Sequence, residues 1–228
     1  MPHSLYVVAC YPQYQKTKFM YKTFLLIGLI LISLTSFGQT KENEFGLKGG
    51  LNYSSFIDNN DKDITADYNG KIGFHIGGYI ALGITEKLSI RPELLYSQQG
   101  SNFSIDGGDL NIFDPNNNFV TSIDGTIKES MILLPIILEY SLSEKFNIGI
   151  GPQFGYSLNR EIEFDDNPFG GGFLKNDDSE NFDIGLDIEF GYSLAENYVV
   201  YLRYNYGILE RQNLHTSVIQ LGINYRIN

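Results

Sequence analysis

Tryptophan is absent from this chain of 228 residues, and cysteine occurs once, at Cys10. Cys10 lies ahead of the N-terminal apolar run, so it is not the acylated first residue of a mature lipoprotein. The residues that follow this apolar run contain no cysteine. Disulfides, zinc–thiolate sites and cysteine nucleophiles are therefore excluded from that part of the chain. The 16 Tyr, 16 Phe and 24 Gly favour strands and aromatic belts over helices.

Positive charge is scarce. The chain has 16 Lys and Arg against 27 Asp and Glu, a formal net charge of −11. Removal of residues 1–38 takes away three lysines and no acidic residue, which leaves 13 basic against 27 acidic residues, or −14. Such a surface repels nucleic acid, whose binding demands clustered Lys and Arg. DNA and RNA are therefore excluded as partners.

Long hydrophobic runs are also missing, and the one apolar run, Phe24 to Leu34, is too short to span a bilayer, which takes roughly 20 residues. Lysines precede this run, and Ser36-Phe37-Gly38 follows it. This pattern predicts a secretory signal peptide for Sec-type export, cleaved after Gly38; the alternative is a retained anchor helix. Residues 20–38 make a complete signal peptide, and residues 1–19 are interpreted as an extension from a misplaced start codon.

Residues 39–228 form the predicted mature domain, and their dominant feature is alternation of apolar and polar residues with a period of two. The last strand shows it best, because Ile219, Leu221 and Ile223 alternate with Gln220 and Gly222. Similar stretches predict eight strands, at residues 44–56, 70–82, 88–99, 126–141, 146–158, 182–193, 198–208 and 215–228. Each is at least about as long as the 9 to 11 tilted residues that a strand needs to cross hydrocarbon.

The connections between these strands alternate in length. Short ones recur at residues 83–87, 142–145 and 194–197, whereas polar segments, three of them long, lie at residues 57–69, 100–125, 159–181 and 209–214. Outer-membrane barrels have short periplasmic turns and longer extracellular loops. We therefore expect an all-β protein: an eight-stranded antiparallel up-and-down transmembrane β-barrel with both termini in the periplasm.

A soluble, lipocalin-like ligand-binding barrel is the main alternative fold, and it would turn its apolar face inward. Two features argue against it. The polar face is rich in Gly, Ser and Asn, which suit the crowded interior of a narrow barrel. Aromatic residues fall near the ends of the apolar rows, as interface girdles do: Tyr53, Tyr96, Tyr140, Phe146, Tyr156, Phe182, Tyr192 and Tyr198. We expect the outer membrane to be the location and its lipid a partner.

The polar face also holds charges of both signs, five basic and five acidic when Lys71 and Asp183 are included. Confined charges need partners because their desolvation is costly. The parity of the strands predicts a structural ion-pair cluster in the lumen: Lys48, Arg91, Glu93, Glu139, Asp187, Glu189, Arg203 and Arg226. A path for protons, ions or substrate through a narrow-pore channel is the alternative. The fourth strand is irregular, since Met131, Leu133 and Ile137 fall on the same face.

No catalytic, cofactor or metal site is predicted. Gly149, Gly151 and Gly155 lack the spacing of a nucleotide-binding loop, and His75 and His215 show no metal-ligand spacing. A hydrolase is the alternative in which His215 would approach one of three acidic residues, Asp58, Asp165 or Asp178. The acidic stretches 58–67 and 165–178 lack a complete calcium loop. We expect a protein that is not an enzyme.

Three segments, at residues 91–100, 134–140 and 149–155, resemble the PorT-like outer-membrane β-barrel domain family. They read RPELLYSQQG, LPIILEY and GIGPQFG, with prolines that are unexpected inside strands. The resemblance implies the barrel fold and, for some members, a role in secretion or assembly. The C-terminal Tyr225-Arg226-Ile227-Asn228 departs from barrel-insertion signals, which end on an aromatic residue. The expected function is a non-enzymatic outer-membrane barrel that anchors surface loops or supports an envelope or secretion assembly.

Overall fold

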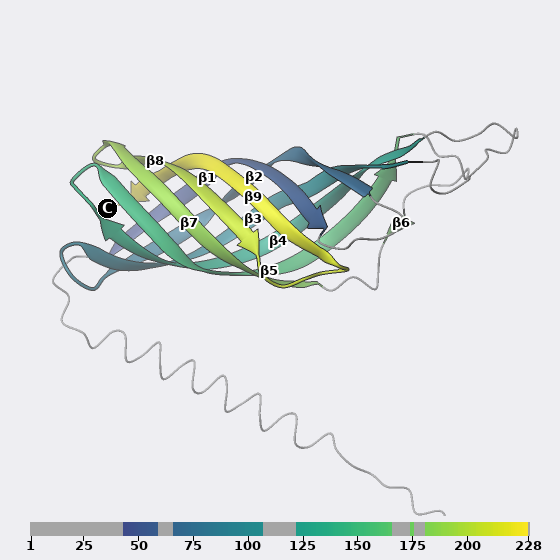
Figure 1. Cartoon of the computed structure of the whole chain (residues 1–228). Coiled ribbons are helices and arrows are strands. Elements are labelled where there is room, and N and C mark those ends of the chain that lie inside the picture. The colour runs from purple at the N-terminus through teal and green to yellow at the C-terminus, as the bar shows by residue number, and fades with distance from the viewer. Residues whose placement is uncertain (1–42, 59–65, 107–121, 166–173, 176–180, 228) are drawn as a thin grey trace, which may run out of the picture. The chain divides into compact units, whose positions relative to one another are not determined.

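The computed structural model describes residues 43–58, 66–106, 122–165, 174–175 and 181–227. The chain divides into two units, residues 1–39 and 40–228. The predicted leader, residues 1–38, lies outside the described residues, and the second unit is an all-β domain (Figure 1). In the part of the chain that the structure describes, no helix is long and apolar enough to cross a membrane.

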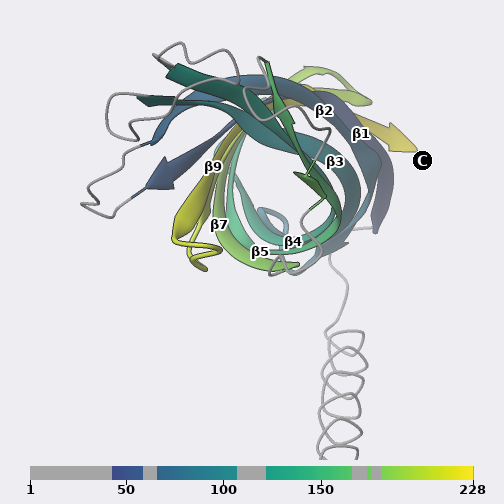
Figure 2. The same cartoon turned by 90° about the vertical axis from the view of Figure 1, so that its right-hand side faces the viewer.

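Eight long strands and one two-residue strand make up the domain. They are β1 (Glu44–Asp58), β2 (Ala66–Gly83), β3 (Leu88–Asp106), β4 (Ser122–Ser141), β5 (Phe146–Phe164), β6 (Leu174–Lys175), β7 (Phe182–Ala195), β8 (Tyr198–Gly207) and β9 (Leu214–Ile227). Each long strand pairs antiparallel with its neighbours in the order β4-β3-β2-β1-β9-β8-β7-β5, and the β4–β5 pairing closes the ring. Figure 2 shows this ring from one end. The predicted eight-stranded up-and-down barrel is confirmed.

The barrel has a turn end and a loop end. At the turn end short hairpins join β2 to β3, β4 to β5 and β7 to β8, and the C-terminus lies there too (Figure 1). Two of these hairpins share one geometry. Thr85 Oγ1 accepts a hydrogen bond from the amide of Leu88 at 3.0 Å, and Ser143 Oγ accepts one from the amide of Phe146 at 3.2 Å. The turns Thr85-Glu86-Lys87 and Ser143-Glu144-Lys145, which are similar in sequence, therefore have the same structure.

Apolar side chains cover the outside of the ring, as the alternation predicts. Leu51, Leu94 and Leu202 on three different strands are each about half or more exposed. Exposed aromatic residues at the turn end include Tyr140, Phe146, Tyr192, Tyr198 and Tyr225. The rings of Phe146 and Tyr192 lie 4.9 Å apart, and those of Tyr198 and Tyr225 lie 5.1 Å apart. A soluble ligand-binding barrel would turn its apolar face inward, whereas this barrel turns it outward.

Strands β3, β4 and β5 run further toward the loop end than the alternation predicts, so that parts of the expected loops 100–125 and 159–181 are strand. The hydrophobic faces exchange along these extensions. In β3 and β4, Phe103 and Ile127 point inward and are buried, whereas their neighbours Asn102 and Lys128 are exposed. An outward polar face marks where the wall leaves hydrocarbon. The extensions therefore form a rim with an apolar interior at the loop end of the ring.

A β-bulge changes the parity of β5. Ser130 pairs with Asn159 while Met131 pairs with Ser157, so Leu158 is the extra residue. Beyond the bulge Arg160 is buried, although the alternation before the bulge places residue 160 on the outer face. The bulge thus adds a cation to the interior.

Candidate functional site: the filled lumen

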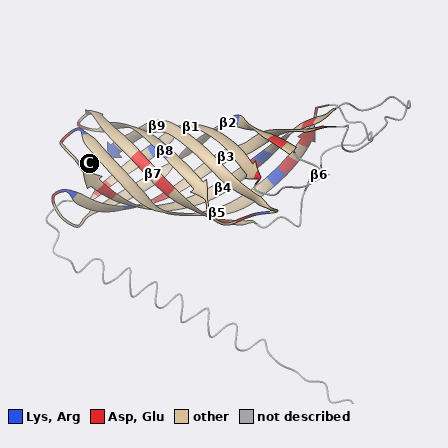
Figure 3. Ribbon diagram, in the orientation of Figure 1, with Lys and Arg blue, Asp and Glu red and all other residues tan. Residues whose placement is uncertain are grey.

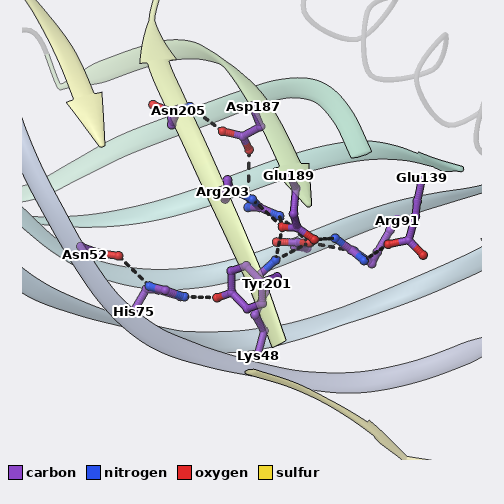
Figure 4. A network of polar contacts seen from close by, with 11 residues as sticks. Lys48, Asn52, His75, Arg91, Glu139, Asp187, Glu189, Tyr201, Arg203 and Asn205 are labelled. Atoms are coloured by element: carbon purple, nitrogen blue, oxygen red, sulfur yellow. Dashed lines mark hydrogen bonds and ion pairs between the residues drawn. The ribbon is translucent and has the colours of Figure 1, made fainter. Parts of the chain in front are cut away.

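An ion-pair network, which we call the inner network, crosses the lumen between β1, β3, β4, β7 and β8 (Figure 4). Its members are Lys48, Arg91, Glu93, Glu139, Asp187, Glu189 and Arg203. Period two places Arg91 beside Glu93, and Asp187 beside Glu189, on the inward faces of two strands. The register then sets Glu189 directly opposite Arg203. Seven of the eight predicted lumen residues are therefore brought together.

The contacts within the inner network are dense. Lys48 Nζ lies 3.1 Å from Glu93 Oε1 and 2.7 Å from Glu189 Oε2. Arg203 donates from Nε to Glu189 Oε2 at 2.8 Å and from Nη2 to Glu93 Oε1 at 2.8 Å. Arg91 donates to Glu93 at 2.9 Å and also bonds Glu189 and Glu139.

Several of these pairs bridge opposite walls rather than neighbouring strands. Strands β3 and β8 lie four steps apart in either direction around the ring of eight, so the Arg203–Glu93 pair spans its full width. An eight-stranded barrel encloses a space just wide enough for side chains to fill. Three cations facing four carboxylates fill it here, and their side chains are nearly all without solvent exposure.

Arg226, the eighth predicted member, lies apart from the inner network. Its Nε atom is 3.3 Å from Glu44 Oε2, and both side chains are more than a fifth exposed at the turn end. The alternation along β9 predicts the face on which Arg226 lies, but it does not predict how far along the barrel axis the side chain is. Lys71, which was also assigned to the polar face, lines a surface depression with Lys128 and Glu161.

His75 belongs to a buried hydrogen-bond chain that the sequence analysis does not predict. Its Nδ1 lies 2.6 Å from Asn52 Oδ1, and its Nε2 bonds the hydroxyl of Tyr201. Lys48 Nζ stands 3.8 Å from the centroid of the Tyr201 ring, which links this chain to the inner network. The partners of His75 lie 23 and 126 residues away in sequence, so no local spacing indicates them.

A second charged cluster, the outer cluster, lies nearer the loop end. Arg211 donates from Nη1 and Nη2 to the two carboxylate oxygens of Glu129, at 2.7 and 3.1 Å. Asp183 accepts a hydrogen bond from Thr216 at 3.0 Å and lies 3.6 Å from Arg211 Nη2. All four side chains are buried.

Arg211 reaches the interior from a segment predicted to be an outer loop. Residues 211–214 form a tight hairpin in which Arg211 and Leu214 exchange backbone hydrogen bonds of 2.9 and 3.0 Å. Gln212 and Asn213 have φ values of 53° and 64°, the left-handed pair that a two-residue hairpin requires. The hairpin holds Arg211 at the mouth of the ring, where its side chain meets Glu129.

Two clusters of apolar side chains also lie in the described interior, among further buried polar residues such as Gln99, Gln153 and Gln220. Leu95, Met131 and Leu133 form a fully buried cluster, so the irregular face of the fourth strand belongs to the lumen. At the loop end a second cluster, the rim cluster, consists of Phe56, Phe103, Ile127 and Leu214, against which Tyr68, Ile105, Ile162 and Phe164 pack. Along β4 the inward residues therefore change from charged to apolar and back, from Glu139 through Leu133 and Met131 to Glu129 and Ile127. Figure 3 marks the charged positions on the ribbon.

Two residues of the hydrolase alternative lie on the paired strands β1 and β9, where Asp58 is opposite Leu214 and Ile57 is opposite His215. His215 Nδ1 bonds the carbonyl of Gly207 at 2.9 Å, and its ring stacks on Tyr206. Asp178 lies outside the described residues, as do most of the two acidic stretches. Within the described part of the chain, no group of three or more His, Cys, Asp or Glu is placed to hold a metal ion.

Comparison with known proteins identifies the architecture. No curated protein matches the chain. Neisserial surface protein A is similar in structure, with a TM-score of 0.52 and 11% sequence identity over 82% of this chain and 100% of that one. OprG from Pseudomonas aeruginosa has a TM-score of 0.47 and 13% identity, over 82% of this chain and 97% of that one. Ail of Yersinia pestis has a TM-score of 0.45 and 14% sequence identity, over 82% of this chain and 100% of that one.

The likeness to Neisserial surface protein A supports the fold alone, because the sequences have diverged so far. The family is assigned from the sequence, because residues 37–210 match a family described as the outer membrane protein beta-barrel domain. This match covers most of the chain and seven of the eight long strands. The apolar outer wall is then the surface that faces membrane lipid. The chain belongs to the outer membrane protein beta-barrel domain family and is an integral protein of the outer membrane.

Proposed function

We propose that this protein is a non-conducting, non-enzymatic barrel that anchors its loop-end segments at the cell surface. The observation that carries the proposal is the Arg203–Glu93 ion pair, which spans the ring within the inner network. An ion path would have to break such pairs, and separating a buried pair is costly. Between this pair and the loop end, the outer cluster and the rim cluster also fill the lumen.

The loop-end rim supports an anchoring role. Strands β3, β4 and β5 project beyond the lipid-facing wall, with a polar outer face and an apolar interior. A rim of this kind is a suitable base for the segments 107–121 and 166–173, which follow β3 and β5 in the sequence. Binding residues are commonly placed on loops that a rigid scaffold positions.

Antibody labelling of intact cells tests the anchoring role. An epitope tag inserted within residues 107–121 should be labelled on intact cells, because it lies at the extracellular end. A tag added after Asn228 should be labelled only after permeabilisation, because the C-terminus lies at the turn end. Labelling of the C-terminal tag on intact cells would contradict the proposed orientation.

Support of an envelope or secretion assembly is the second candidate, and it rests on the resemblance of residues 91–100 and 134–140 to the PorT-like family. Co-purification from detergent-extracted outer membranes distinguishes the two roles. An assembly subunit retains defined partner proteins, whereas a free-standing anchor elutes alone. Under this second candidate role, we also propose that the protein is a member of the PorT-like group.

Export through a cleaved signal peptide completes the proposal, with residues 1–38 removed and residues 39–228 forming the mature domain. Mass spectrometry of the protein from outer membranes should give an N-terminus at Gln39. Recovery of residues 24–38 in the membrane-embedded protein would support an uncleaved anchor instead.

A further inference from the structure

Three prolines lie side by side in the wall of the barrel. Pro92 in β3 is opposite Ile136, the residue next to Pro135 in β4. Pro135 is in turn opposite Gln153, the residue next to Pro152 in β5. The three therefore form one line across neighbouring strands, which we call the proline seam.

The pairing of the strands is interrupted along the proline seam. Between β2 and β3 it stops after Tyr79↔Glu93 and resumes at Leu82↔Ile90, so Pro92 and its neighbour are left out. The β3–β4 and β4–β5 ladders have equivalent gaps beside Pro135 and Pro152. A proline has no amide hydrogen to donate across a ladder, which accounts for each gap. Hydrocarbon offers no hydrogen-bond partner to the backbone groups left unpaired beside such gaps, so the proline seam is a weak line in the wall.

A groove of about 450 Å³ opens on the outer wall at one end of the proline seam. Its lining includes Phe45, Gly78, Pro92, Leu94, Leu134 and Ile227. The wall is hollowed there because Gly78 has no side chain to fill the space between its exposed neighbours Ile76 and Ile80. Glu93 also borders the groove, through its backbone, since its side chain is buried in the inner network.

The position of the groove indicates what fills it. Phe45 and Ile227 lie at the turn-end limits of β1 and β9, so the groove is in the periplasmic half of the wall. It is continuous with the lipid-facing surface, since Phe45, Leu94 and Ile227 are all exposed on that surface. Apolar cavities stay dry, and an empty one loses the dispersion contacts of its lining. The remaining occupant is a hydrocarbon chain.

We propose that this groove is a binding site for one acyl chain of a phospholipid in the periplasmic leaflet. The bound chain packs over Pro92 and Leu94 and covers the interrupted β2–β3 pairing. This site goes beyond the anchoring role and is independent of whether the lumen conducts. It requires only that the barrel is embedded in the outer membrane.

Two matched glycines provide the first test. A side chain at Gly78 would enter the groove, and a Cβ added there meets its nearest atom, the carbonyl oxygen of Gly46, at 3.3 Å. Gly49 lies on β1 outside the lining, and its nearest contact is 3.5 Å. Both Gly78→Leu and Gly49→Leu should fold, as the heat-dependent mobility shift of intact barrels in gel electrophoresis will report.

Native mass spectrometry of the protein extracted from outer membranes gives the readout. The natural protein and Gly49→Leu should retain one phospholipid, and Gly78→Leu should retain about tenfold less, the loss that ~1.4 kcal/mol of packing produces. Equal retention by the two variants would overturn the site. Retention of lipopolysaccharide in place of phospholipid would overturn the assignment to the periplasmic leaflet.

A fluorescent reporter tests the site in a bilayer and does not depend on Gly78→Leu alone. The chain has no Trp, so Leu94→Trp introduces a single emitter at the groove and Leu221→Trp places one on the wall at β9. Both leucines are more than half exposed, so neither change disturbs the interior. Small fractions of phosphatidylcholine with brominated chains should quench the emission of the Leu94→Trp variant well before that of the Leu221→Trp variant. Equal quenching of the two variants would contradict a preferred acyl-chain site.

Discussion

Arg203 on β8 donates a hydrogen bond of 2.8 Å from Nη2 to Oε1 of Glu93 on β3, across the full width of the ring and across 110 residues of sequence. The same guanidinium bonds Glu189 on the neighbouring strand and lies 3.4 Å from Asp187. One side chain thus ties opposite walls of the barrel together, and the account of a filled lumen depends on it.

Loss of this cation should destabilise the barrel strongly. Arg203→Ala leaves Glu93 and Glu189 with fewer buried partners, and breaking a buried pair in this way costs about 3 to 5 kcal/mol. Arg226→Ala is the matched control, because its pair with Glu44 is partly exposed at the turn end and should cost about 1 kcal/mol or less. Urea unfolding in phospholipid bilayers measures both, and equal small losses would contradict the bridging role.

The outer cluster should show energetic coupling between its two charged members. Single and double substitutions Arg211→Ala and Glu129→Ala form a cycle, and the bidentate buried contact predicts a coupling of about 1 to 3 kcal/mol. The exposed pair Lys128–Glu163, with Nζ and Oε2 2.5 Å apart, offers a second cycle, for which about 0.2 to 1 kcal/mol is expected. Similar coupling in both cycles would show that Arg211 is not held in the interior.

Tyr201→Phe should leave the Nε2 atom of buried His75 without its partner, at a cost of about 1 to 3 kcal/mol. Tyr204→Phe also removes a hydroxyl, but that hydroxyl contacts Ser217 on the exposed face, and a change of about 0.5 kcal/mol or less is expected. Equilibrium unfolding of the two variants decides whether the His75 chain contributes to stability.

The lipid-facing wall predicts a dependence on depth. Leu202→Arg places a charge in the hydrocarbon near the middle of β8 and should cost about 2 to 4 kcal/mol. Leu142→Arg changes a similarly exposed leucine in a turn at the membrane boundary and should cost about 1 kcal/mol or less. Folding yields and unfolding curves in bilayers measure both losses. Equal losses for Leu202→Arg and Leu142→Arg would contradict the predicted dependence on depth.

Alternation in the sequence predicts the strands and their faces well where the wall lies in hydrocarbon. It underestimates β3, β4 and β5 because hydrophobicity exchanges faces beyond the membrane, as at Asn102 and Phe103. The polar outer face of these extensions looks like loop sequence. Strand ends are therefore predictable only while the solvent outside the strand stays the same.

Residue depth and long-range partners are not available from parity. Arg226 shares a face with the inner network yet pairs with Glu44 at the turn end. Arg160 and Arg211 enter the interior through a bulge and a left-handed hairpin, neither of which alternation can indicate. The ion-pair cluster was predictable as a set of inward charges, but its pairing follows from the register and closure of the ring.

Planar-bilayer recording of the unmodified protein tests the central claim most directly. With Arg203, Glu93 and Glu189 bridging the ring and the rim cluster beyond them, reconstituted barrels should leave the bilayer current at its baseline under applied voltage. Insertion is verified in the same membranes by protease protection of the membrane-spanning strands. A current that stays at baseline with barrels inserted is the result expected of a filled lumen, whereas stable, ion-selective single-channel steps would contradict it and favour the narrow-pore channel.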